Sequence, residues 1–223
     1  PVVHGSLRDT ISYAEAISDR ELIAAIDNPM ILPDGRVESC GNFHGAPIAQ
    51  AADFLAISIA DISALCERRT DRMLDRNRSH GLPPFLAADP GVDSGMMIAH
   101  YTQAALVAEN RRLAAPASVD TIPTSALQED HVSMGWSSCR KLRTAVRNLR
   151  RILAIEFVVA ARAIEHRALE PGPGVAAAVR QLRDQVPGWG PDRWLSPELA
   201  AAENMLANPS LVSEISSALG GLE

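Results

Sequence analysis

The sequence is poor in aromatic residues and in cysteine. Aromatic side chains make up only 4% of its 223 residues. Because strands draw on aromatic and β-branched residues, this scarcity argues against a sheet-rich fold. The three cysteines, Cys40, Cys66 and Cys139, are odd in number, far apart and without a Cys-x-x-Cys pair. We therefore expect free thiols in a reducing compartment, and a cytoplasmic protein.

Other absences exclude further classes of protein. The chain has no signal-peptide pattern and no apolar run of membrane-spanning length, so we expect no membrane association. A net charge of −6 argues against nucleic acid as the main partner. The six histidines show no i, i+4 pair or other metal-binding pattern, so no metal site is expected. Because the chain begins at Pro1 without methionine, we expect either that a methionine was removed or that this is a piece of something longer.

The sequence is instead rich in helical patterning, since hydrophobic residues make up 47% and alanine is abundant. The spacing of apolar residues and the positions of proline and glycine predict seven helices, over residues 5–27, 47–76, 95–114, 129–167, 174–186, 197–207 and 209–219. Pro33-Asp34-Gly35 predicts a turn in a small hairpin or irregular loop. We predict an all-α fold, with a bundle of long helices over 1–168 and a small helical C-terminal region over 169–223.

Two apolar patterns within the long helices predict how they pack. A seam with alternating steps of four and three residues is typical of left-handed packing in a helix bundle, and it consists of Ile48, Ala52, Leu55, Ile59, Ile62 and Cys66. Residues 154–164 are apolar nearly all round and must be buried on every side. Because the chain has few long helices to enclose this stretch, we infer burial against other subunits and an oligomeric protein.

The segment Thr124–Met134, TSALQEDHVSM, holds consecutive polar side chains at the predicted helix start, among them Gln128 and Glu129. Such groups are costly to bury unless a ligand or partner satisfies them. Glu129 is therefore a candidate acid or base, or an anchor for a cationic substrate. In the alternative interpretation Glu129 and Asp130 complement the dipole of the first helical turn and Ser125 caps it. The residue pattern alone favours this second interpretation.

The segment Ser39–Ala49 places Asn42, Phe43 and His44 on the loop before a long helix. A loop that carries these three side chains is a candidate ligand-binding wall, because binding residues concentrate on loops held by a rigid scaffold. In the alternative interpretation Asn42 caps the loop and Phe43 fills the core. The residue pattern alone slightly favours the alternative.

Several long motifs, taken together and in order, resemble the histidine ammonia-lyases within the aromatic amino acid lyase family. The matching segments are PVVHGSLRD, DNPMIL, GNFHGAPIAQAADFLA, LCERR, GLPPFL, SGMMIAH, AENRRLAAPASVDTIPTSALQEDHVSM and RRILAIE. The resemblance implies an enzyme of histidine catabolism that eliminates ammonia from L-histidine to give trans-urocanate. It also implies a mainly helical homotetramer in which three subunits build each active site.

The resemblance assigns roles to the two candidate segments. Glu129 matches the position at which the histidine-specific branch directs a carboxylate toward the substrate imidazole, and Phe43 matches a position in the active site. Asn42, His44 and Gln128 lie beside these two residues and are carried over as substrate-binding candidates. Two nearby positions depart from the family pattern, with Cys40 where a glycine is common and Leu127 where an asparagine is common.

One family motif is missing altogether. The family's electrophilic methylidene-imidazolone ring forms from an Ala-Ser-Gly triad, which does not occur in this chain. The family's catalytic tyrosine belongs to a motif expected just before Pro1. We therefore predict a truncated lyase that is inactive alone and works with an N-terminal lyase fragment or a full-length relative. The alternative is a non-catalytic helical oligomer, a relic or a regulatory or scaffold protein, so whether the chain serves as an enzyme stays open.

Overall fold

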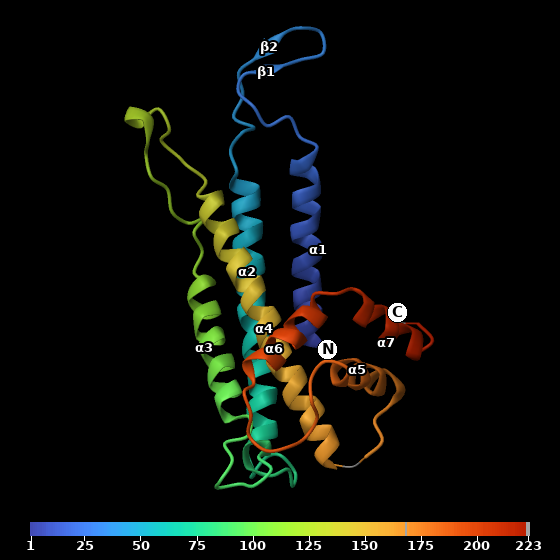
Figure 1. Ribbon diagram of the computed structural model, residues 1–223. Helices are drawn as coiled ribbons and strands as arrows, with labels where there is room; N and C mark the ends of the chain where they lie inside the picture. Colours follow the sequence, from blue (N-terminus) through green and yellow to red (C-terminus); the bar gives the residue numbers. More distant parts are fainter. Residues whose placement is uncertain (168, 222–223) are drawn as a thin grey trace. The chain divides into compact units, whose positions relative to one another are not determined.

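The computed structural model describes residues 1–167 and 169–221 (Figure 1). The helices of this part of the chain are α1 (Val2–Leu22), α2 (Ala46–Leu74), α3 (Met97–Leu113), α4 (Gly135–Arg167), α5 (Pro173–Arg183), α6 (Ser196–Leu206) and α7 (Ser210–Ala218). The short strands β1 (Met30–Ile31) and β2 (Val37–Glu38) pair antiparallel, with Met30 opposite Glu38. The all-α fold and the small hairpin are thus confirmed.

The chain forms two compact units. The first contains Pro1–Ile62 and Glu109–Val146, and the second contains Ser63–Ala108 and the residues from Arg147 onward. Helices α2, α3 and α4 each contribute residues to both units. The predicted boundary after residue 168 falls at a residue outside the described ones and stays a prediction.

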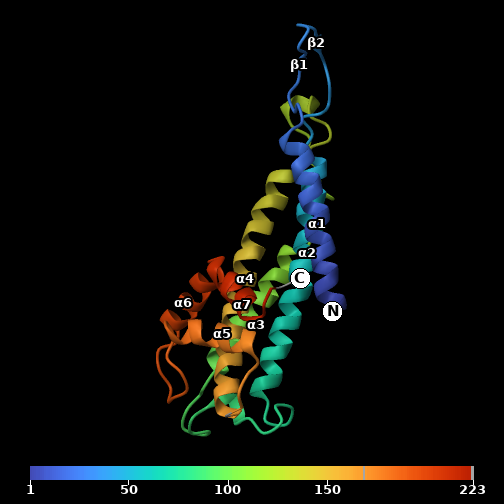
Figure 2. The same ribbon diagram turned by 90° about the vertical axis from the view of Figure 1, so that its right-hand side faces the viewer.

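In the first unit, α1 runs alongside the first part of α2 (Figures 1 and 2). Thr10, which is buried, accepts a hydrogen bond from Ser58 Oγ at 2.9 Å and donates one to the Ser6 carbonyl at 2.8 Å. The Tyr13 and Phe54 rings meet edge to face with centroids 5.8 Å apart. A satisfied hydroxyl pair and an aromatic contact therefore join the two helices.

The second unit encloses the apolar stretch of α4, and this corrects the inference that other subunits must bury it. Ala154, Ile155, Val158 and Val159 are each at most 4% exposed in the single chain. They share one core cluster with residues of the C-terminal helices, among them Leu182, Ala202 and Leu211. The three short helices α5 to α7 therefore supply the cover that we expected from neighbouring subunits.

Helix α4 begins at Gly135, six residues later than the predicted start at Glu129. Left-handed backbone at Ser125, Ala126, Leu127 and again at Met134 prevents an α-helix from forming across this segment. Ser125–Leu127 instead forms the 3₁₀ turn η2, which has no side-chain cap. The interpretation of Glu129 and Asp130 as first-turn residues capped by Ser125 is therefore wrong.

Helix α2 corrects a second expectation, that no segment is long and apolar enough to cross a membrane. An 18-residue window of this helix has a mean hydropathy of 1.5, and 44% of the window is buried inside the protein. A core helix of a globular protein passes the same test of length and composition. The seam residues Ala52, Ile59, Ile62 and Cys66 are indeed at most 5% exposed, so this helix packs as a core element.

Candidate active site

All five sequence-predicted site residues lie on two loops of the first unit. Asn42, Phe43 and His44 lie on the loop that precedes α2, and Gln128 and Glu129 lie on the loop that precedes α4. Both loops lead directly into long helices, which gives each loop a rigid support.

The loop before α2 is fastened to the chain that follows α1. Asn42 Nδ2 donates a hydrogen bond to the Ala25 carbonyl at 2.6 Å, and the Cys40 amide donates one to Asn28 Oδ1 at 3.1 Å. Phe43, next to this anchor, is 47% exposed. Asn42 thus ties the loop to the segment that follows α1, through a bond outside its own loop. Phe43, by contrast, does not fill the core of this chain and presents an apolar ring at the surface.

The loop before α4 closes on itself around η2. The Thr124 amide donates a hydrogen bond to the Glu129 carbonyl at 2.9 Å, and the Glu129 amide donates one to the Thr124 carbonyl at 3.3 Å. The Val132 amide donates a hydrogen bond to Thr121 Oγ1 at 2.7 Å. Gln128 and Glu129 are both exposed. Glu129 therefore stands at the end of a tight loop, with its carboxylate accessible to a ligand.

The structure brings these two loops together through a histidine pair. His44 Nε2 donates a hydrogen bond to the backbone carbonyl of His131 at 2.7 Å. The two imidazole rings stack with centroids 5.4 Å apart and an interplanar angle of 1°. A Cβ on Gly45 would lie 3.0 Å from Ser133 Oγ, and a Cβ on Gly135 would lie 3.4 Å from the Gly45 carbonyl oxygen, so the two segments approach closely. His131 was not among the predicted site residues, although it directly follows the Gln-Glu-Asp run.

A buried carboxylate supports the same region from within. Asp53 on α2 is 3% exposed and accepts hydrogen bonds from the Ser118 amide at 2.7 Å, Ser138 Oγ at 2.9 Å and Lys141 Nζ at 3.0 Å. Burial raises the pKa of the Asp53 carboxyl, but these hydrogen bonds together outweigh it and hold the pKa below the ordinary aspartate value. Asp53 thus fixes the start of α4 against α2 as an ionised carboxylate.

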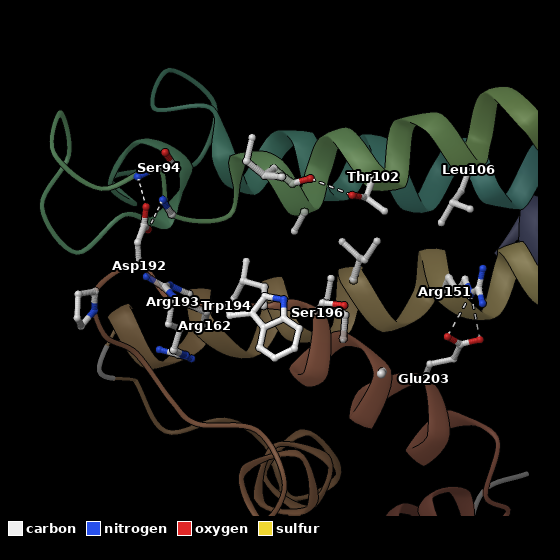
Figure 3. Close-up of a pocket in the computed structure, with 18 residues that line it drawn as sticks. Ser94, Thr102, Leu106, Arg151, Arg162, Asp192, Arg193, Trp194, Ser196 and Glu203 are labelled. Atoms are coloured by element: carbon white, nitrogen blue, oxygen red, sulfur yellow. Dashed lines mark hydrogen bonds and ion pairs between the residues drawn. The ribbon is translucent and has the colours of Figure 1, made fainter.

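The second unit contains a cavity that was not predicted from the sequence. It measures about 680 Å³ and lies between α3, α4 and the segment from Pro191 to Glu203 (Figure 3). At one end Arg151 pairs with Glu203 at 3.2 Å, and at the other Asp192 accepts hydrogen bonds from the amides of Ser94 and Gly95. These polar groups bond to one another, so the cavity offers mainly an apolar surface.

Comparison with known proteins places these loops in a family context. The family model described as aromatic amino acid lyase matches residues 1–184. A histidine ammonia-lyase of Streptomyces griseus is 60% identical over the whole chain, and one of Natranaerobius thermophilus is 43% identical over the whole chain. In both cases the chain spans 44% of the relative's length.

Solved structures agree with the sequence matches. The crystal structure of histidine ammonia-lyase from Trypanosoma cruzi aligns with a TM-score of 0.93 and 39% identity, over 98% of this chain and 44% of that one. Tyrosine aminomutase from Streptomyces globisporus aligns with a TM-score of 0.92 and 37% identity, over 97% of this chain and 42% of that one. The chain therefore has the fold of less than half of each of these longer proteins.

Proposed function

The chain belongs to the aromatic amino acid lyase family, and from this premise we propose that it forms the substrate-orienting portion of a histidine ammonia-lyase. The complete enzyme eliminates ammonia from L-histidine and releases trans-urocanate. The observation that carries this proposal is the junction of the two loops, which holds the exposed Glu129 and the exposed Phe43 on joined segments of one unit.

The chemistry of these two side chains suits an imidazole ligand. The Glu129 carboxylate accepts a hydrogen bond from an imidazole N–H, and a charge-assisted bond of this kind fixes the orientation of the ring. The Phe43 ring supplies an apolar wall against which the planar substrate packs. Because both residues are exposed in the single chain, we propose that other polypeptide segments cover them and exclude water during the reaction.

The chain's own part in the reaction is limited to binding and orientation. The methylidene-imidazolone of the family supplies an electrophile, but no Ala-Ser-Gly triad is present here from which the group can form. An electrophile contributes a covalent step that a positioned carboxylate does not replace. We therefore propose that the electrophile and the proton-abstracting tyrosine come from an N-terminal lyase portion, and that the chain alone is inactive.

We propose that the assembly is a cytoplasmic homotetramer, whose subunits contribute jointly to each active site. The missing triad also supports a second candidate function, a helical oligomer without catalysis that serves as a scaffold or regulates a full-length relative. The two candidates differ in one respect that is measurable. Only the first requires that the chain complete an active lyase when the remaining portion is supplied.

A chimera tests this requirement. The part of the Streptomyces griseus enzyme that precedes the matched region is joined to this chain, and urocanate formation is followed by its ultraviolet absorbance. We expect activity from the chimera and none from the 223-residue chain. An assembled, folded chimera without activity would favour the scaffold function. Urocanate produced by the chain alone would contradict the proposed division of roles.

Substitution of Glu129 in the chimera tests the orienting role. Glu129→Gln keeps the shape of the side chain but removes the anionic acceptor, and we expect kcat/KM for L-histidine to fall about 100-fold. The matched control is Asp130→Asn, which removes the neighbouring exposed carboxylate and is expected to change kcat/KM less than about threefold. Equal effects of the two substitutions would assign the loss to the charge of the loop and not to Glu129.

A further inference from the structure

The hydrogen bond between His44 and His131 defines the chemical state of the His44 ring. A carbonyl oxygen only accepts hydrogen bonds, so the 2.7 Å contact requires a hydrogen on His44 Nε2. The partner is a backbone atom 87 residues away along the chain, and its position therefore depends on the conformation of the loop. The stacked His131 ring adds a second contact, which restricts rotation of the His44 ring.

Each side of this bond is held by further contacts. On the side of His44, Asn42 bonds to the Ala25 carbonyl, so the residues that flank Phe43 are both fixed. On the side of His131, the amide of the neighbouring Val132 donates a hydrogen bond to Thr121 Oγ1. Two residues before His131, Glu129 exchanges backbone hydrogen bonds with Thr124. The His44 hydrogen bond is thus a side-chain link between two otherwise locally anchored loops.

We infer that His44 is a positioning residue, which fixes the loop of Glu129 relative to the loop of Phe43 by its hydrogen bond to the His131 carbonyl. Nε2 is occupied by this bond, so His44 acts through His131 and not by contact of this nitrogen with the substrate. Its relevance to catalysis rests on the proposed function, because that function assigns the carboxylate and the apolar wall to these loops. The link itself is a property of this chain and is measurable without any activity.

The choice of replacement separates a specific hydrogen bond from general packing. His44→Gln retains an N–H donor on a side chain of similar reach, whereas His44→Ala removes both the donor and the ring. His131→Ala removes the stacked ring but leaves the backbone carbonyl in place. His4→Ala is the matched control, since His4 is an exposed histidine of the same unit. Circular dichroism establishes that each variant is folded.

Amide hydrogen exchange of the 223-residue chain measures the link directly. In peptides that cover residues 122–134 we expect exchange about tenfold faster in His44→Ala, as loss of one specific hydrogen bond implies. We expect His44→Gln to stay within about threefold of the unmodified chain, His131→Ala to lie between the two, and His4→Ala to show no change. Unchanged exchange in His44→Ala, or equally fast exchange in His44→Gln, would overturn the inference.

The chimera then tests whether the link matters for the reaction. We expect His44→Ala to lower kcat/KM for L-histidine at least about tenfold, and His44→Gln to restore most of it. Glutamine keeps the N–H donor but lacks the imidazole ring. Recovery of kcat/KM in His44→Gln would therefore show that the hydrogen bond matters and not the volume of the ring. If the unmodified chimera forms no urocanate, the proposed function fails, and the exchange measurement still decides the positioning role. If the chimera is active and His44→Ala leaves its kinetics unchanged, the positioning role in catalysis is refuted.

Discussion

Asp53 is a buried carboxylate of α2 whose charge is satisfied by hydrogen bonds from Ser118, Ser138 and Lys141. Asp53→Asn removes that charge while Lys141 remains in place, and we expect the free energy of unfolding to fall by about 1.5–3 kcal/mol, the range for hydrogen bonds to charged groups. Denaturant titration at neutral pH measures the change. Asp61→Asn, at an exposed position of the same helix, is the control and is expected to change stability by less than about 0.5 kcal/mol.

The pH dependence of stability provides a separate test of Asp53. Its folded-state pKa lies below the ordinary value of 3.8, so the folded state favours the ionised form. The resulting stabilisation is present above the unfolded-state pKa and is lost as the pH falls through the folded-state pKa. We expect the unmodified chain to lose stability below about pH 4 more steeply than Asp53→Asn. Parallel acid profiles for the two proteins would show that Asp53 makes no such contribution.

The three cysteines differ in their predicted reactivity. Burial raises the pKa of the Cys66 thiol to about 12, and Cys66 is 0% exposed, whereas Cys40 is partly exposed. Because the thiolate is the reactive form, we expect alkylation at pH 8 to modify Cys40 first and Cys66 at least about 100-fold more slowly. Timed alkylation with peptide mass spectrometry measures this order. The unfolded chain, in which the three thiols react alike, is the control, and rapid labelling of Cys66 in the folded chain would contradict the prediction.

At the scale of elements, Gly95 joins the start of α3 to the turn η1 (Pro84–Leu86). Its φ is +59°, and a Cβ there would lie 2.5 Å from the Phe85 carbonyl oxygen and 2.9 Å from the Ala87 backbone. Gly95→Ala must therefore displace backbone, and we expect a loss of about 2–4 kcal/mol in the free energy of unfolding. Thermal and denaturant unfolding measure the loss.

The control for Gly95 is a glycine that has room for a methyl group. A Cβ on Gly5, inside α1, meets nothing within 4 Å. Gly5→Ala is expected to stabilise the chain by about 0.5–1 kcal/mol, because alanine has the higher helix propensity. If both substitutions have the same effect, close backbone contact at Gly95 is not the cause.

The helices themselves could be predicted because each carries a periodic apolar face. The spans of α2 and α3 agree with the predicted ranges to within three residues at each end. The start of α4 could not be predicted, because a run of polar residues is compatible both with the first turn of a helix and with a loop. The left-handed backbone at Leu127 and Met134 has no signal in residue spacing. The cover of the apolar stretch in α4 was also missed, since it comes from three short helices far along the chain.

Only part of the candidate site could be predicted from the sequence. Motif resemblance identifies Phe43 and Glu129, and their roles stay predictions. The residue pattern alone favoured a structural interpretation for both, which the exposure of Phe43 and the loop position of Glu129 contradict. The stacked pair of His44 and His131 joins residues 87 positions apart, and a single sequence gives no indication of such a contact.

At the scale of the whole molecule, the exposed face of α2 bears on assembly. Phe54 and Ile57 are each 46% exposed on this helix, and Tyr13 of α1, 47% exposed, contacts Phe54. Large apolar side chains grouped on a surface are typical of an interface between proteins. We predict that this face lies between subunits of the proposed homotetramer. The apolar stretch of α4 no longer supports association, because the single chain already buries it.

Sedimentation velocity tests the assembly and the face together. We expect the unmodified chain to sediment as a tetramer at micromolar concentration, and Phe54→Glu to raise the dissociation constant at least about 30-fold, as loss of a central aromatic contact implies. Val37→Glu is the control, because it replaces an apolar, 63% exposed side chain of the hairpin with the same charged residue and leaves α2 intact. A monomeric unmodified chain would refute the bundle assembly. A charged side chain buried in an apolar interface weakens that interface. A tetramer that Phe54→Glu does not weaken would therefore confirm the assembly but show that its interfaces lie on other faces.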